Sequence, residues 1–227
     1  MNRRSLGTLA ARDFRQLRLL VAIYCAIIAG VLVSATAGEG SLAEDLSGLF
    51  LLPGVLALLA VVPFVQTIVW KEKAAGTFLL LRMLPLTDDE ILFSKLVVVT
   101  AAGSFILLVP ALALAAAAMA AGGGLPAQAG WMLLWEWVGL AVMTGWSTAS
   151  AIVFTQQWAA VVPYLALLAA SMPFIAAGYA LGPSFWAAIV RWHAPQWGLV
   201  PASLLAWHGW RLSLRLFHNR DFAQLVE

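Results

Sequence analysis

Long apolar runs separated by short polar segments make up almost the whole of this chain. Five of these runs are long enough for a helix of about 20 residues that crosses a bilayer. A sixth run begins near Trp197 and has only about fourteen residues before Arg211. It crosses the hydrocarbon only if Arg211 reaches toward the interface and the helix continues to Leu214. We therefore predict an all-α integral membrane protein with six transmembrane helices, at about 19–37, 46–70, 96–121, 131–154, 158–181 and 197–214.

The two ends of the chain and one internal segment depart from this pattern. Residues 1–18 place arginines beside apolar residues at helical spacing, which predicts an amphipathic helix on the membrane surface, with a solvated basic tail as the alternative. The segment 182–196 is apolar but interrupted by Pro183, Arg191 and Pro195, and we interpret it as a broken or re-entrant segment on the far side. Residues 19–214 then form the transmembrane domain, and residues 215–227 form a basic tail.

The composition supports a membrane protein and narrows its chemistry. The chain is 63% hydrophobic and 11% charged, whereas a soluble domain carries about 25% charged residues. Its net charge of +2 gives no indication of a nucleic-acid partner. Because there is one cysteine, Cys25, no intrachain disulfide is predicted. The three histidines do not fall at metal-ligand spacings, so we predict no metal site.

Twelve of the thirteen lysines and arginines fall in three segments. Five precede the first span, four lie within 71–95, and three follow from Arg211 onward. Segments rich in lysine and arginine stay in the cytoplasm. We therefore expect both termini and residues 71–95 on the cytoplasmic side, which requires an even number of spans and agrees with six. Only Arg191 falls elsewhere.

The polar segment 71–95, between the second and third spans, predicts a short helix with a stop at each end. Gly76 interrupts the helix of the second span, and residues 77–84 are long enough for about two helical turns. Pro85 disfavours helical geometry at the residue before it, so the short helix ends there. We expect this helix to lie parallel to the membrane surface.

A capping box follows the short helix. The Thr87 hydroxyl is placed to accept from the backbone N–H of Glu90, while the Glu90 carboxylate reaches back to the N–H of Thr87. The third membrane helix is therefore expected to begin at about Asp88, in the cytoplasm, and to enter the membrane near Lys95.

Three parts of this segment together resemble the type-2 ATP-binding-cassette (ABC) exporter permeases. They are Glu72-x-x-x-Gly76-Thr77, then Leu79-Leu80-x-x-x-Leu84-Pro85-Leu86, then Glu90-Ile91-Leu92-x-x-Lys95. The basic N-terminal helix, the six spans, the broken segment before the last span and the tail from Phe217 to Asp221 also look like that family. One departure is Phe78-Leu79, where the family often has Leu-Glu, so the acid for an ionic contact is missing here.

The resemblance implies that residues 77–84 are a coupling helix, which sits in a groove of a separate ATPase subunit. Phe78, Met83 and Leu84 would be its apolar contact residues, and Arg82 a polar contact at the rim. Ordinary packing at the membrane surface is the alternative. The coupling residues implied by the resemblance are Gly76, Thr77, Phe78, Leu80, Arg82, Met83, Leu84 and Pro85.

The same resemblance implies the partners and the location. Two ATPase subunits would bind ATP and Mg²⁺, and a second permease copy or a paralogue would complete the complex in the bacterial cytoplasmic (inner) membrane. This chain itself has no Gly-x-x-x-x-Gly-Lys, no His-Glu-x-x-His and no Gly-x-Ser-x-Gly. We therefore predict no catalytic residue and no cofactor in it.

One acid lies within a predicted span. Glu136 is interpreted either as part of a polar path with Arg191 or as an interfacial residue between Trp135 and Trp137. Two other functions stay open: a membrane scaffold or assembly factor, and an ion-driven secondary transporter, which would need paired acids or internal repeats. An amphipathic drug, a lipid, a peptide or haem all suit the apolar spans, and haem-exporter permeases share a similar segment.

Overall fold

A computed structural model describes residues 3–36, 42–84, 86–120, 129–182 and 194–219. Pro85 and Arg191, and most of the segment 182–196, lie outside these described residues. The elements run in the order α1 (Arg3–Thr36), α2 (Leu42–Val65), the π-helix η1 (Gln66–Trp70), α3 (Lys71–Ala74), α4 (Thr77–Leu81), α5 (Asp88–Ala120), α6 (Ala129–Val153), α7 (Gln156–Leu181) and α9 (Ala194–Asn219). The described part of the chain is all-helical, as predicted, and contains no strand.

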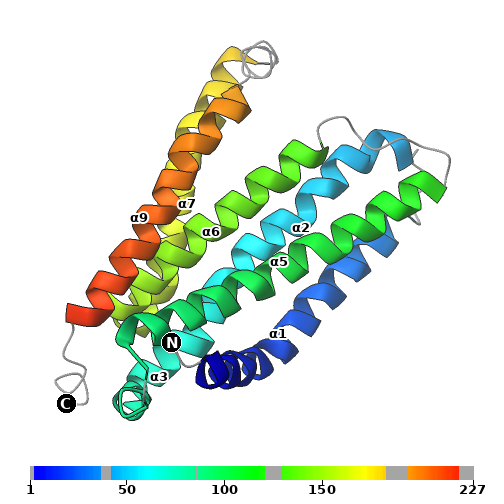
Figure 1. Ribbon diagram of the computed structural model, residues 1–227. Coiled ribbons are helices and arrows are strands. Elements are labelled where there is room, and N and C mark those ends of the chain that lie inside the picture. The colour runs from blue at the N-terminus through cyan, green and yellow to red at the C-terminus, as the bar shows by residue number, and fades with distance from the viewer. Residues whose placement is uncertain (1–2, 37–41, 85, 121–128, 183–193, 220–227) are drawn as a thin grey trace.

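The long helices form one bundle, and the short helices lie at one end of it (Figure 1). α2 packs between α5 and α6, α1 packs on α5, and both α7 and α9 pack on α6. The short α3 and the turn of helix that follows it lie at the end of the bundle where α1 begins (Figure 1). This end therefore brings together segments that are far apart in the sequence.

Within the described residues, four helical stretches are long and apolar enough to cross a membrane. They are Leu6–Val31, Leu52–Ala74, Asp88–Ala120 and Gln156–Leu181, and they overlap the predicted spans one, two, three and five. The predicted fourth and sixth spans correspond to α6 and α9, which are not among the four. α9 is the less apolar of these two helices, because it ends in basic and polar residues.

The helix boundaries differ from the prediction at both ends of the chain. The expected surface helix 1–18 and the first span form one continuous helix, α1, which changes direction along its length (Figure 1). Residues 8–29 contain no glycine or proline, and the leucines and arginines around residues 18 and 19 favour helix. The helix therefore continues from the amphipathic segment into the first span. At the other end, α9 passes through Arg211 and Leu214 to Asn219.

α6 and α9 form the most extensive helix pair. A Cβ atom added at Gly145 would lie 2.8 Å from the backbone nitrogen of Trp210. The Ser213 hydroxyl donates to the carbonyl of Gly145 at 2.7 Å, and the Trp210 indole donates to the carbonyl of Ala141 at 3.0 Å. Small residues and hydroxyl bonds between helices are typical of membrane bundles. This pair therefore depends on the absence of a side chain at residue 145.

Candidate functional site

The helix of the second span ends at a left-handed glycine. Gly76 has φ 66° and ψ 7°, a conformation that costs little only without a side chain. The Thr77 hydroxyl donates to the carbonyl of Glu72 at 3.1 Å, which satisfies a backbone group left free at the helix end. The chain therefore reverses sharply here, and α4 begins at the next residue.

The predicted short helix is present but shorter than 77–84. α4 covers Thr77–Leu81, and Arg82, Met83 and Leu84 continue it as turns, with backbone N–H groups bonded at 3.0 to 3.1 Å to the carbonyls of Phe78, Leu80 and Leu81. The expected capping box follows. Glu90 N donates to Thr87 Oγ1 at 3.2 Å, and Thr87 N donates to Glu90 Oε2 at 3.0 Å. α5 accordingly begins at Asp88.

Phe78 does not face outward. Its side chain is 1% exposed, and its ring packs edge-to-face on Phe217 of α9 with the centroids 4.9 Å apart. The ammonium of Lys95 lies 5.6 Å from the centre of the same ring. The expectation that Phe78 contacts a partner directly is therefore corrected, because the ring is an internal contact that holds α4 against α5 and α9.

Arg82 is likewise bound within the chain. Its guanidinium donates to both carboxylate oxygens of Asp88, at 3.0 and 2.9 Å, and to the carbonyl of Phe217 at 3.4 Å. It also lies 5.7 Å from the centre of the Phe217 ring. Arg82 was expected to be a rim contact for a partner. The observed contacts instead join the end of α4 to the start of α5 and to α9.

Among the described side chains of this segment, three apolar ones lie at the surface. Leu80 is 62% exposed, Met83 is 80% exposed and Leu84 is 43% exposed. Exposed apolar residues that lie together mark interaction sites more often than single ones do. We call these three residues, one on α4 and two in the turns that follow it, the exposed apolar surface of α4.

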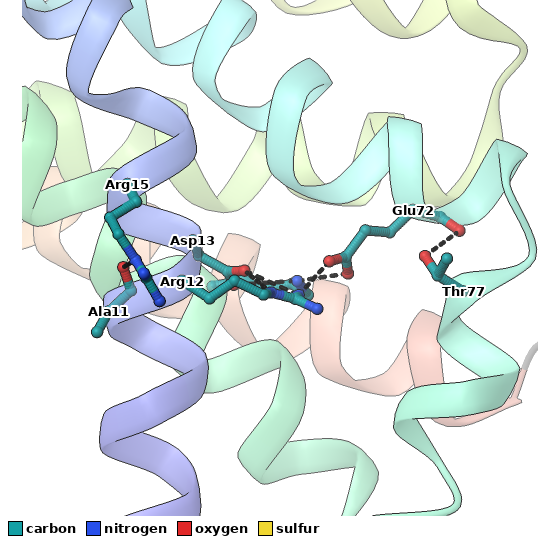
Figure 2. Close-up of polar contacts among 7 residues, drawn as sticks. Ala11, Arg12, Asp13, Arg15, Glu72 and Thr77 are labelled. Carbon is teal, nitrogen blue, oxygen red and sulfur yellow. Dashed lines mark hydrogen bonds and ion pairs between the residues drawn. The ribbon is translucent and has the colours of Figure 1, made fainter.

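A four-charge network lies beside α4 and was not predicted from the sequence. Asp13 and Lys95 are fully buried, with Lys95 Nζ 3.1 Å from Asp13 Oδ2 and 2.5 Å from Glu72 Oε2. Arg12 contacts the carboxylates of both Asp13 and Glu72 (Figure 2). Two cations and two carboxylates from α1, α3 and α5 thus neutralise one another. The only sequence signals were the two motif residues Glu72 and Lys95, and the single acid within 1–18.

Lys73 joins the same region to α6. Its ammonium donates to the carbonyls of Ala151, Ile152 and Phe154, at 3.1, 3.0 and 2.9 Å. The last carbonyls of a helix have no partner within the helix, and a cation there is favourable. Glu72, Lys73 and Arg82 therefore connect the segment 71–84 to α1, α5, α6 and α9.

Glu136 lies in α6 against α2. Both of its carboxylate oxygens are buried, and neither has a hydrogen-bond partner among the described residues. A Cβ atom added at Gly54 would lie 2.0 Å from the Glu136 carboxyl carbon, so the group packs directly on the α2 backbone. The carboxylate therefore packs within the chain, and the position of Glu136 relative to the membrane interface stays a prediction. The expected pairing with Arg191 falls outside the described residues.

Comparison of the chain with protein-family models, with curated proteins and with solved structures finds no match. Within the described residues, no group of three or more histidines, cysteines or acids is placed to hold a metal ion. The geometry of residues 71–95 and the sequence pattern there are therefore the observations that bear on function.

Proposed function

We propose that this chain is the membrane subunit of an ABC exporter, and that α4 and the turns after it couple it to a separate ATPase. The observation that carries the proposal is the form of this segment. Leu80, Met83 and Leu84 are exposed on a short helix whose opposite side is fixed to the rest of the chain. A partner that closes on ATP needs a contact of this kind, because a flexible loop would absorb its motion.

The internal contacts of the segment support a mechanical role. Phe78 packs on α9, Arg82 binds Asp88 at the start of α5, and Lys73 binds the end of α6. Rigid elements joined by packed side chains and ion pairs transmit displacement between sites. A force on the exposed apolar surface of α4 would therefore reach several long helices together.

The proposal includes the arrangement expected from the sequence. Six spans with both termini in the cytoplasm place α4 where a cytoplasmic ATPase reaches it, in a bacterial inner membrane. Two ATPase subunits supply the ATP and Mg²⁺ chemistry, and a second copy of this chain or a paralogue completes the complex.

The test begins with a search of the neighbouring reading frames for an ABC ATPase, followed by copurification of that ATPase with variants at the exposed positions. Met83→Asp and Leu80→Asp place a charge in the proposed contact, and loss of a central apolar contact commonly costs about 2 kcal/mol or more. We therefore expect at least a 30-fold weaker association. Met83→Leu keeps the apolar side chain and should bind normally, as should Asp89→Ala, which removes an exposed acid nearby.

Both aspartate variants must remain inserted and monodisperse in detergent for this comparison. Phe78→Ala is not a useful variant, because the buried ring supports the chain itself. If Met83→Asp and Leu80→Asp bind the ATPase and transport like the unmodified chain, α4 is not the coupling helix. If the unmodified chain retains no ATPase, a membrane scaffold becomes the better interpretation.

A further inference from the structure

A pocket lies between α1 and the end of the second span. Its volume is about 470 Å³, and its lining residues come from α1, η1, α3, the turn before α4 and the first residue of α4. Thr67 and Lys71 border it where the apolar run of α2 gives way to the charged segment 71–95, next to Trp70. Tryptophan beside a lysine at a span end marks the headgroup level of a membrane. The lining residues are Arg12, Gln16, Thr67, Lys71, Glu72, Ala75 and Thr77.

Unused hydrogen-bond donors face this region. The observed contacts of Arg12 use its Nε and Nη2 atoms, which leaves the two N–H groups of Nη1. Lys71 is exposed and forms no ion pair with any described residue.

The charges around the pocket favour an anion. Three cations (Arg12, Lys71 and Lys95) stand against two carboxylates (Asp13 and Glu72). The carboxylate of Glu72 is compensated by Lys95 and Arg12, so the positive charge of Lys71 is the excess. The pocket therefore offers donors and one net positive charge to a ligand.

An apolar stripe continues from the pocket along α1. Leu19, Ile23 and Ile27 follow Gln16 at spacings of three, seven and eleven residues, which places all four on one side of the helix. The three apolar side chains are 68%, 46% and 46% exposed. A ligand with a negatively charged head group and hydrocarbon chains would find hydrogen-bond donors in the pocket and apolar side chains along this stripe.

We propose that this pocket binds the phosphate headgroup of an anionic phospholipid. The phosphate oxygens accept from Arg12 Nη1 and from Lys71, and the acyl chains lie along the stripe on α1. Basic pockets between membrane helices on the cytoplasmic side bind anionic headgroups in this way. The proposal concerns the lipid surroundings of the chain and does not depend on ATP-driven transport.

The test uses native mass spectrometry of the detergent-solubilised chain with phosphatidylglycerol, phosphatidylcholine or inorganic phosphate added. We expect phosphatidylglycerol to be retained in preference to phosphatidylcholine. Lys71→Gln should weaken its binding about fivefold, the contribution of one basic residue near a lipid surface. Gln16→Trp fills the pocket and should also displace the lipid while leaving every charge in place.

Arg15→Gln is the matched control. Arg15 lies on the side of α1 away from Glu72 and donates to the carbonyl of Ala11 at 3.3 Å (Figure 2). The Arg15→Gln variant should leave lipid retention unchanged, although it removes one positive charge, as Lys71→Gln does. Three results would overturn the proposal: equal loss with Arg15→Gln, equal retention of the two lipids, or retention of inorganic phosphate without phosphatidylglycerol.

Discussion

Lys95 is completely enclosed, and its ammonium contacts Asp13 and Glu72. Replacing it by alanine leaves two buried carboxylates that share the single cation Arg12. Breaking a buried ion pair by removing one partner costs about 3–5 kcal/mol. We expect Lys95→Ala to lose stability on this scale, measured by denaturant titration of the chain in detergent micelles.

Two further variants test whether the loss of stability in Lys95→Ala arises from the four-charge network. Arg15→Ala removes an exposed cation from the same region and should change stability by less than about 0.5 kcal/mol. The double variant Asp13→Leu/Lys95→Leu removes one charge of each sign and should cost less than the sum of its single changes. Additive losses would mean that Asp13 and Lys95 do not interact.

The residues of this network show where sequence reasoning reached its limit. Glu72 and Lys95 were identified as motif positions through the resemblance to a known family. Thr87 and Glu90 were identified as a capping box, because local spacing determines such a box. Asp13 lies 82 residues from Lys95. No spacing rule links positions that far apart, so their pairing had to be found in the folded chain. The burial of Phe78 escaped prediction for the same reason, because Phe217 lies near the other end of the sequence.

At the scale of helices, the crossing of α6 and α9 makes a prediction about Gly145. A Cβ atom there would meet the backbone of Trp210 at 2.8 Å and of Gly209 at 2.9 Å, and backbone atoms cannot rotate away as a side chain can. Overpacking of this kind costs about 1–3 kcal/mol. Gly145→Ala should therefore lower the thermal midpoint of the detergent-solubilised chain.

Gly30→Ala is the matched control for that change. Gly30 also lies within a helix, but a Cβ atom added there meets nothing within 4 Å. Alanine is favoured over glycine in helices by about 0.5–1 kcal/mol, so Gly30→Ala should leave stability unchanged or raise it. If Gly145→Ala behaves like Gly30→Ala, α6 and α9 do not approach as closely as described.

Element positions were predicted better than element boundaries. The apolar runs located each long helix, because about 20 apolar residues have few other stable arrangements in a membrane. The joining of the surface helix and first span into α1 was not predicted. A change from amphipathic to fully apolar sequence indicates that a helix passes from the membrane surface into the hydrocarbon. Such a change does not end the helix.

For the whole molecule, the distribution of lysine and arginine gives the clearest prediction. With Cys25 replaced by serine, single cysteines at positions 42 and 126 should react with a membrane-impermeant maleimide from outside intact cells. Cysteines at positions 75 and 220 should react only after the membrane is opened, because basic segments remain in the cytoplasm. External labelling at position 75 would refute the six-span topology with cytoplasmic termini.

The contact between Asp13 and Lys95 has a consequence for synthesis of the chain. The two residues are 82 positions apart, and ribosomes add about 5–20 residues per second. Lys95 is therefore added to the chain about 4–16 seconds after Asp13. During that interval the Asp13 carboxylate has Arg12 as a cation partner, but its buried contact with Lys95 does not yet exist. The four-charge network that joins α1 to α5 therefore cannot be complete until α5 has begun to be made, and α1 cannot take up its final contacts with α5 before then.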